Sequence, residues 1–313
     1  MKRFTALLFG ICALQASLLS FAESIQQKAV LVTGANSGIG LRMTEQLTAK
    51  GFFVYAGVRR EEAMAELNEL ENVMAVQFDV RDQKQIDAAA KLIEEQGKGL
   101  YGLINNAGVS VFGPIIEMPV DQLEYQMDVN VYGVVRVTHA FAPMIIESQG
   151  RIATTGSVAG VRSPAFMGAY SMSKHAIEAY TESLAQEMAR FKVSVHVIEP
   201  AAYGTNIGNA ARKRFSELNY WPETTRYQQE REFVIKRLSG FDQGPDPIDV
   251  AQAAVDLMTS EHPKFRYMVT SKPEEAHGIV RSQIRKAVQL NGGQRHELSK
   301  EELTAMLEEE LGG

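Results

Sequence analysis

Tyr170 and Lys174 are the residues whose types and spacing point most directly to proton-transfer chemistry. They lie four positions apart in a helical pattern over 170–191, so both side chains are expected on one helix face. A neighbouring ammonium group favours the phenolate and lowers the tyrosine pKa from its ordinary value of about 10. A tyrosine tuned in this way can exchange a proton with an alcohol oxygen. The spacing alone is common in helices, so the hypothesis depends on neighbouring residues.

Two further polar residues fit the same chemistry. Ser157 follows a predicted strand, Arg151–Thr155, and precedes Tyr170 by 13 residues. At the carboxyl edge of a sheet its hydroxyl is placed to hydrogen-bond a substrate carbonyl. Asn130 lies inside the apolar helical pattern 121–148, where a buried amide needs a partner or a functional water. We predict that these residues meet Tyr170 at one site.

A glycine-rich turn follows the first predicted strand. Thr33 begins the pattern T-G-x-x-x-G-x-G, with glycines at Gly34, Gly38 and Gly40, and a helical pattern comes next. Glycine permits a tight turn and lets backbone N–H groups approach a pyrophosphate at the helix N-terminus. The spacing differs from the usual G-x-G-x-x-G, and glycines in such a turn can also be purely structural. In this context the turn predicts nucleotide binding.

The end of the second predicted strand bears on the choice of cofactor. An acidic residue at this position binds the ribose 2′-hydroxyl of NAD, whereas an arginine accommodates the 2′-phosphate of NADP. Gly57 occupies the expected acidic position, and Arg59 and Arg60 follow. The sequence therefore favours NADP (NADPH) over NAD, the alternative being that both arginines are only solvated.

Strand and helix patterns alternate along most of the chain. The predicted strands are Ala29–Thr33, Phe53–Val58, Val73–Phe78, Gly102–Asn105, Arg151–Thr155, Val193–Ile198 and Tyr267–Thr270. Helical patterns between them cover Leu41–Lys50, Gln83–Gln96, Asp121–Ser148 and Tyr170–Phe191. Apolar strands that alternate with helices predict an α/β fold, a Rossmann-type doubly wound parallel sheet of about seven strands in a single catalytic domain over residues 25–271.

Two segments lie outside this alternation. Residues 206–244 are polar and aromatic and follow a strand at its carboxyl end, which predicts a substrate lid, with a surface helix as the alternative. Residues 272–313 are charged and form a predicted C-terminal helical extension, interpreted as plain surface helix.

The N-terminus has the composition of a targeting segment. Lys2 and Arg3 precede an apolar, uncharged run from Phe4 to Phe21, and small residues suitable for cleavage flank Phe21. Residues 1–24 are therefore predicted to be a cleaved signal peptide or an uncleaved membrane anchor. Either reading places the protein in an exported (periplasmic) or membrane-anchored location, which conflicts with a soluble nicotinamide cofactor kept inside cells.

Composition excludes several other classes of function. A net charge of −6 gives no indication of a nucleic-acid partner. The single cysteine, Cys12, rules out a disulfide within the chain, and the six histidines show no metal-ligand spacing, so no metal site is expected.

Together these motifs resemble the short-chain dehydrogenase/reductase family over about residues 28–271. The glycine turn, Asn105-Asn106-Ala107-Gly108, the mid-helix Asn130, and Ser157 before a Y-x-x-x-K motif follow the family's order. The resemblance implies an NADP(H)-dependent oxidoreductase that interconverts an alcohol and a ketone or aldehyde. It implies that Tyr170 is the general acid/base, that Lys174 lowers its pKa and holds the nicotinamide ribose, that Ser157 orients the substrate oxygen, and that Asn130 holds a water linking Lys174 to solvent.

The same resemblance implies a set of cofactor contacts beyond Tyr170 and Lys174. They are Gly34, Ser37, Gly38, Ile39 and Gly40 at the pyrophosphate turn, Arg59 at the 2′-phosphate, Asp79 and Val80 at the adenine, Asn106, Ala107 and Gly108 at the adenosine ribose, and Pro200 and Thr205 at the nicotinamide end. Ala201 departs from the family, which usually has glycine after this proline, and weakens the expectation for that contact.

Three segments are similar to the 17β-hydroxysteroid and retinol dehydrogenase branch of the family. They are Gly51–Ala56 with Arg59, Ile198–Pro200 with Tyr203, and Phe265–Tyr267. This similarity implies a lipophilic small-molecule substrate, and the long helical patterns imply a homo-oligomer. A different class of function also fits the apparent export signal, namely a non-catalytic nucleotide-binding sensor or scaffold, although such a protein has no need of Tyr170.

Overall fold

The computed structural model of the chain describes residues 27–238, 240 and 243–312. Seven parallel strands form one sheet in the order β3-β2-β1-β4-β5-β6-β7. The strands are β1 (Ala29–Thr33), β2 (Phe53–Val58), β3 (Val73–Gln77), β4 (Gly102–Asn105), β5 (Arg151–Thr155), β6 (Ser194–Pro200) and β7 (Arg266–Val269). The chain builds the sheet outward from β1 in one direction and then from β4 in the other. A crevice therefore opens at the carboxyl ends of β1 and β4, where α/β sheets bind ligands.

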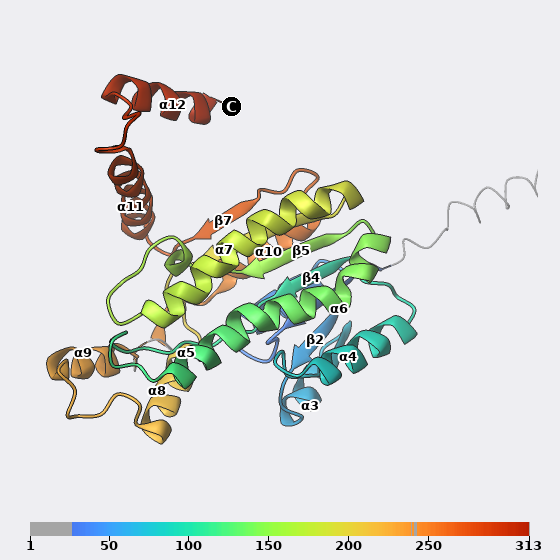
Figure 1. Ribbon diagram of the computed structural model, residues 1–313. Helices are drawn as coiled ribbons and strands as arrows, with labels where there is room; N and C mark the ends of the chain where they lie inside the picture. The colour runs from blue at the N-terminus through green and yellow to red at the C-terminus, as the bar shows by residue number, and fades with distance from the viewer. Residues whose placement is uncertain (1–26, 239, 241–242, 313) are drawn as a thin grey trace, which may run out of the picture.

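Helices cover both faces of the sheet (Figure 1). On one face lie α2 (Gly38–Ala49), α3 (Glu62–Asn68) and α10 (Ile248–Thr259). On the other lie α4 (Gln83–Glu95), α6 (Gly133–Glu147) and α7 (Gly168–Met188). This arrangement confirms the predicted Rossmann-type doubly wound sheet.

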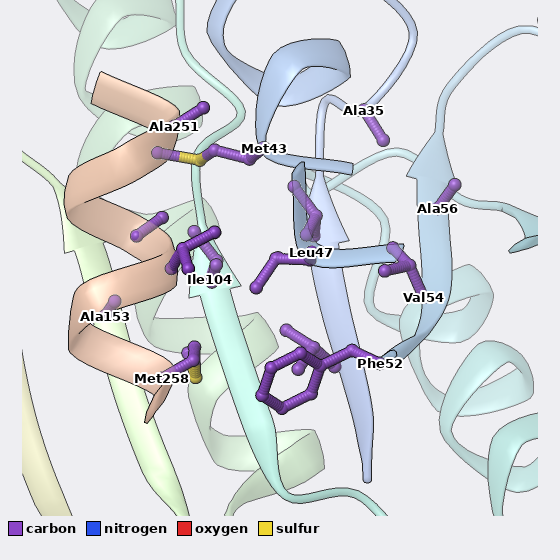
Figure 2. Close-up of a cluster of buried hydrophobic side chains, with 14 of the residues drawn as sticks. Ala35, Met43, Leu47, Phe52, Val54, Ala56, Ile104, Ala153, Ala251 and Met258 are labelled. Carbon is purple, nitrogen blue, oxygen red and sulfur yellow. The ribbon is translucent and has the colours of Figure 1, made fainter. Parts of the chain in front are cut away.

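Burial of apolar side chains on both faces holds these layers together. Figure 2 shows Met43 and Leu47 of α2 and Met258 of α10 packed over the sheet around Val54 and Ile104. All five side chains are at most 1% exposed. Strands with apolar residues facing both ways are what a sheet sandwiched between two helical layers requires.

One long helical run lines the second face of the sheet and is interrupted by a π-helical turn. It comprises α5 (Val120–Met127), a π-helical turn η1 (Asp128–Tyr132) and α6. The run Val120–Glu147 is also, by length and composition, the one described helix apolar enough to cross a membrane. Its apolar side chains, such as Phe141, pack in the core of the domain instead. Asn130 lies within the π-helical turn, a feature common at functional sites.

The predicted strands and helices are all present; β1, β2, β4 and β5 have the predicted bounds, and the ends of the other elements differ by at most three residues. β6 extends two residues further than predicted and brings Pro200 to the sheet edge beside Val269 of β7. Two helices were missing from the prediction, α3 and α10. A short π-helical break and two 3-10 turns, η2 (Val158–Gly160) and η3 (Ala189–Phe191), were also not expected.

The two segments outside the alternation are helical. The proposed lid contains α8 (Ile207–Leu218) and α9 (Gln228–Leu238), and the C-terminal extension contains α11 (Pro273–Asn291) and α12 (Lys300–Gly312). In Figure 1, α11 and α12 extend beyond the end of the sheet. The predicted signal peptide or anchor, residues 1–24, lies outside the described residues.

The core makes a stability prediction. Phe141 of α6 is fully buried in the core on the second face of the sheet, beside Phe78, so Phe141→Ala is expected to lower the free energy of unfolding by about 3–5 kcal/mol. Urea denaturation followed by circular dichroism measures this loss. Leu290→Ala is the matched control, because Leu290 is 82% exposed on α11 and its truncation should change stability by no more than about 0.5 kcal/mol. Equal losses in the two variants would contradict the assigned core.

Candidate active site

A cavity of about 620 Å³ opens along the carboxyl edge of the sheet, from the turn after β1 to helix α9. Nearly all of the predicted site residues line it. They are Gly34, Ser37, Gly38, Ile39, Gly40, Arg59, Asp79, Val80, Asn106, Ala107, Gly108, Ser157, Tyr170, Lys174, Pro200 and Thr205. Asn130 is the exception, because it lies behind the cavity wall at 2% exposure.

The glycine turn has a shape that side chains would destroy. Gly34 has φ +67°, and a Cβ there would lie 3.0 Å from the Ala107 Cα. A Cβ on Gly40 would lie 2.2 Å from the Gly34 carbonyl oxygen and 2.6 Å from the Asn106 amide nitrogen. Both of the Gly40 distances are shorter than the contacts that real Cβ atoms make. These glycines therefore let the turn after β1 pass directly against the loop after β4.

Helix α2 presents its N-terminus to the cavity with its first N–H groups uncapped. The N-cap residue, Ser37, makes no side-chain capping hydrogen bond, and the first turn contains no acidic residue. A helix N-terminus in this state carries partial positive charge and unpaired donors, which suit an anion. The turn and helix thus fit the pyrophosphate of a dinucleotide.

A set of hydrogen bonds joins the ends of three neighbouring strands. The Thr33 hydroxyl at the end of β1 accepts from the backbone N–H groups of Asn106 and Ala107, each at 2.9 Å. The Asn106 side chain donates to the Thr33 carbonyl at 3.0 Å and accepts from the Thr155 hydroxyl at 3.2 Å. These bonds fix the floor of the cavity across β1, β4 and β5.

The far end of the cavity carries the charges expected to meet an adenosine. Arg59 is exposed at the end of β2, and Gly57 beside it is buried against Phe78. Asp79 forms an ion pair with Arg81 at 2.7 Å. Burial alone would raise the pKa of Asp79, but the hydrogen bonds and charge of Arg81, with the charge of Arg59, lower it. Asp79 is therefore a carboxylate at neutral pH, and its ion pair is with Arg81 and not with Arg59.

The candidate catalytic side chains converge at the other end. Ser157 starts the turn after β5, and its hydroxyl lies in hydrogen-bonding contact with that of Tyr170. Lys174 is one turn along α7 from Tyr170, with its Nζ 5.7 Å from the centre of the tyrosine ring. The Lys174 ammonium donates to the Thr155 carbonyl at 2.7 Å. The structure brings together the three residues that the spacing predicted to meet.

Protonation in this cluster is governed first by burial. Burial raises the pKa of Tyr170, and the hydrogen bond with Ser157 opposes the rise. Burial also lowers the pKa of Lys174 to about 8, against the charge of Glu178, which raises it. The expected lowering of the tyrosine pKa by Lys174 is thus not the dominant effect in the protein alone, because burial outweighs it.

Asn130 acts on the site from behind the wall. Its side chain accepts from the Val109 N–H at 2.9 Å and donates to the Val109 carbonyl at 3.0 Å and to the Ser173 hydroxyl at 3.1 Å. Ser173 in turn donates to the Tyr170 carbonyl at 2.7 Å. Gln126, one turn earlier and fully buried, bonds the same loop at Val109 and Val111. The two amides therefore connect the loop after β4 to the helix that carries Tyr170.

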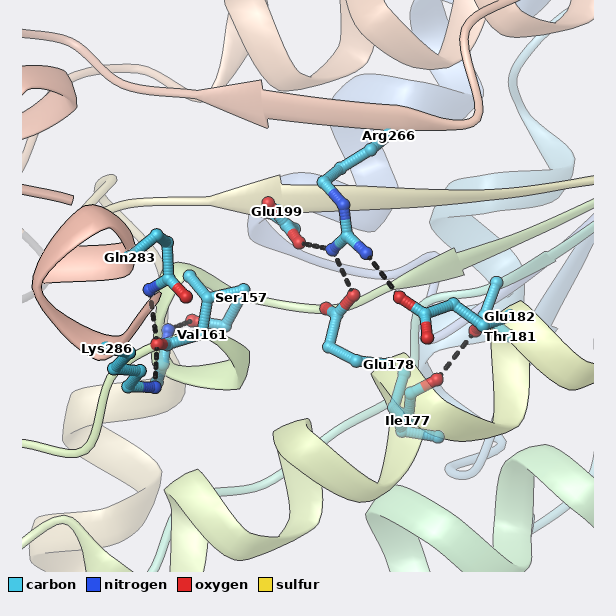
Figure 3. Close-up of polar contacts among 11 residues, drawn as sticks. Ser157, Val161, Ile177, Glu178, Thr181, Glu182, Glu199, Arg266, Gln283 and Lys286 are labelled. Atoms are coloured by element: carbon cyan, nitrogen blue, oxygen red, sulfur yellow. Dashed lines mark hydrogen bonds and ion pairs between the residues drawn. The ribbon is translucent and has the colours of Figure 1, made fainter. Parts of the chain in front are cut away.

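A partly buried charge cluster lies beneath the Ser157 turn. Arg266 of β7 pairs with Glu178 and Glu182 of α7 and with Glu199 of β6 (Figure 3). Burial and the nearby Glu199 raise the pKa of Glu178 to about 7, although Arg266 opposes this. Because Glu178 is one turn beyond Lys174, its charge helps to keep the ammonium group protonated.

The sequence prediction missed several of these residues. Glu178 has a usable signal, since it continues the i, i+4 face of Tyr170 and Lys174. Gln126 has the same relation to Asn130. Thr33 has a signal as the first residue of the T-G-x-x-x-G-x-G motif, whereas Thr155 has none beyond its place at a strand end. The described residues of the lid, 206–244, include five aromatic side chains, and these do not cover the cavity as a set. Four of them pack with Phe166 in a small core: Phe215, Tyr220, Trp221 and Tyr227. The fifth, Phe233, lines the cavity.

The buried lysine makes a prediction about stability and pH. The pKa of Lys174 is about 8 when folded and 10.5 ordinarily, so the unfolded chain binds more protons between these values. Stability contributed by this group therefore rises with pH through that window, and Lys174→Met lacks the rise. Relative to the variant, the wild type should gain about 2–3 kcal/mol between pH 8 and pH 10.5 in urea unfolding. Lys84→Met, at an exposed lysine, should show no such pH-dependent change; a similar change in both variants would contradict the assignment.

Comparisons with known proteins agree with this geometry. The family model described as short chain dehydrogenase matches residues 28–215. The chain is 30% identical over 286 residues to the mitochondrial D-beta-hydroxybutyrate dehydrogenase of Bos taurus, covering 84% of this chain and 81% of that protein. It is 31% identical to retinol dehydrogenase 16 of Mus musculus, covering 78% of this chain and 80% of the relative.

A solved structure matches the fold as well. The short chain dehydrogenase/reductase of Burkholderia phymatum in complex with NAD superposes with a TM-score of 0.73 at 27% identity, covering 87% of this chain and 98% of that one. The family model, the relatives and the fold lead to one conclusion: the chain belongs to the short-chain dehydrogenase/reductase family of oxidoreductases, in its retinol and hydroxysteroid dehydrogenase-like branch.

Proposed function

We propose that this protein interconverts a lipophilic alcohol and the corresponding ketone or aldehyde with NADP(H) as the hydride carrier. The observation that supports it best is the single cavity that runs from an uncapped helix N-terminus to the Ser157, Tyr170 and Lys174 side chains. A bound nicotinamide would accept or supply the hydride. The chain's own residues would hold the dinucleotide, orient the substrate oxygen and move the proton.

Each polar residue has a distinct task in this proposal. Ser157 donates a hydrogen bond to the substrate oxygen and holds it beside the Tyr170 hydroxyl. Tyr170 gives its proton to that oxygen during reduction and takes it back during oxidation. Lys174 binds the nicotinamide ribose and adds positive charge that favours the tyrosinate, offsetting the effect of burial. Asn130 positions the loop after β4 through its bonds to Val109 and Ser173, and the water expected between Lys174 and solvent would have to bind elsewhere than on the two side-chain N–H groups of Asn130.

The apolar walls support a lipophilic substrate. Beside Tyr170 the cavity is lined by Phe112, Phe166, Met167, Val234 and Leu238. Such walls gain free energy by covering apolar surface, and a few polar groups then fix orientation. Helices α8 and α9 form one side of this space, which is the basis for proposing that residues 206–244 act as a lid.

The mechanism predicts a large effect of removing one hydroxyl. Tyr170→Phe is expected to lower kcat for ketone reduction by about 10²–10⁴-fold, because the proton donor is lost while the ring remains. Stopped-flow or steady-state NADPH consumption measures this. NADPH affinity, followed by fluorescence titration, should change little. Unchanged turnover in Tyr170→Phe would exclude this residue as the acid/base. A wild-type protein that binds NADPH but turns over no carbonyl substrate would instead favour the alternative, a nucleotide-binding protein without catalysis.

The choice of NADP rests on Arg59 and on the absence of an acidic side chain at Gly57. A guanidinium group can bind a 2′-phosphate in a bidentate, charge-assisted manner. Arg59→Gln should therefore weaken NADPH binding by about tenfold or more while leaving NADH binding nearly unchanged. Arg60→Gln is the matched control, because Arg60 is a neighbouring exposed arginine that does not line the cavity. Tight NADH binding and no effect of Arg59→Gln on NADPH would instead assign NAD, the cofactor bound to the Burkholderia phymatum structure.

The cellular setting is proposed from the N-terminal residues alone. The basic start and apolar run of residues 1–24 support export or attachment to a membrane, with the catalytic domain following as residues 25–271. N-terminal sequencing of the protein from the membrane and soluble fractions separates a cleaved signal from an anchor. The homo-oligomer stays a prediction.

A further inference from the structure

The wall of the substrate end of the cavity contains a guanidinium group that the proposed chemistry does not use. Arg162 lies in the loop that joins Ser157 to Tyr170, and it lines the cavity. Its side chain is in none of the ion pairs formed among the described residues. The Arg162 Nε is buried and has no hydrogen-bond partner there.

The charged residues that line the cavity also leave an excess of positive charge near Arg162. Its charged lining residues are Arg59, Asp79, Arg81, Arg162, Lys174 and Arg237, and Asp79 is the one acid among them. Asp79 is paired with Arg81 at the adenosine end. At the substrate end no acidic residue of the described chain lines the cavity beside Arg162 and Arg237. Positive charge thus remains in a largely apolar space after the internal pairs are formed.

The loop that carries Arg162 is held from outside the catalytic domain. The Val161 carbonyl accepts hydrogen bonds from the Gln283 side chain, at 2.6 Å, and from the Lys286 ammonium group (Figure 3). Both donors come from α11 of the C-terminal extension, and the Arg162 N–H donates to the Val158 carbonyl at 3.2 Å. The extension was expected to be plain surface helix, yet it anchors the residue next to Arg162.

A buried donor without a partner costs free energy unless a ligand satisfies it. We infer that Arg162 is a specificity-determining residue that binds an anionic group, a carboxylate, on the lipophilic substrate, with Arg237 contributing positive charge at the rim. The substrate class is therefore an amphipathic oxo or hydroxy acid whose apolar chain separates the reacting carbon from the carboxylate. This inference rests on the proposed function for the reaction at Tyr170, but the binding of the anion does not.

The kinetic test compares acids with their neutral counterparts in the full-length protein. Medium-chain oxo acids that differ in the distance between ketone and carboxylate are each paired with their methyl ester, with NADPH or NADH as the reductant. We expect kcat/KM for the best acid to exceed that of its ester by about tenfold or more, because a charge-assisted pair is lost in the ester. Arg162→Gln should remove this preference by raising KM for the acid at least about tenfold more than KM for the ester, and Arg162→Lys should retain part of it.

Arg190→Gln is the matched control, since Arg190 is an exposed arginine on η3 that does not line the cavity. It should keep the wild-type preference. Equal rates for acids and esters in the wild type would overturn the inference while leaving the proposed oxidoreductase function intact. A uniform loss of NADPH binding in Arg162→Gln would also overturn it, because the guanidinium would then serve the cofactor.

A binding measurement keeps the inference testable without turnover. Trp221 is the single tryptophan of the chain, is 2% exposed, and stacks on Phe166 of the cavity wall with ring centres 5.7 Å apart. Its fluorescence should respond to decanoate, and Arg162→Gln should weaken that binding by about tenfold, whereas decanol should bind both proteins equally. Equal decanoate affinity in the two proteins would refute the carboxylate site. Absence of turnover with any carbonyl, alongside selective decanoate binding, would refute the proposed function alone.

Discussion

The close approach of two backbone segments at the switch point of the sheet is the constraint on which the site depends. The turn after β1 passes so close to the loop after β4 that a Cβ on Gly34 would lie 3.0 Å from the Ala107 Cα, and one on Gly40 would lie 2.6 Å from the Asn106 amide nitrogen. Thr33 and Asn106 hold the two segments together through hydrogen bonds between the side chain of each and the backbone of the other. The floor of the cavity, the exposed helix N-terminus and the position of the following loop all follow from this contact.

A second layer of polar contacts carries that order to the reacting side chains. Gln126 and Asn130 bond the loop after β4 on one side and Ser173 on the other, and Ser173 holds the Tyr170 carbonyl. The π-helical turn lets the Asn130 side chain face this loop in the middle of a long helix. A buried amide network with every group satisfied gives rigidity, and rigidity is what a proton transfer between fixed atoms requires.

Burial and charge oppose one another around the tyrosine and lysine. The apolar surroundings disfavour both a tyrosinate and an ammonium ion, so the protein alone keeps Tyr170 protonated and weakens the proton affinity of Lys174. The charge of Glu178 opposes this by raising the pKa of Lys174. The residues of the site alone therefore leave the pKa of Tyr170 above its ordinary value. A positively charged ligand beside Tyr170 would lower this pKa.

The amino-acid sequence by itself determined the sheet, the glycine turn and the meeting of Ser157, Tyr170 and Lys174. These features depend on spacing along one strand or one helix, and the carboxyl ends of parallel strands lie at the same edge whatever else the chain does. Tertiary structure alone decided which distant segments support them. The pairing of Glu178 with Arg266, the packing of Trp221 on Phe166, and the hydrogen bonds from α11 to the residue beside Arg162 join positions from 55 to 125 residues apart. No local periodicity encodes such contacts, because they are set by how the crossovers and the terminal helix pack onto the finished sheet.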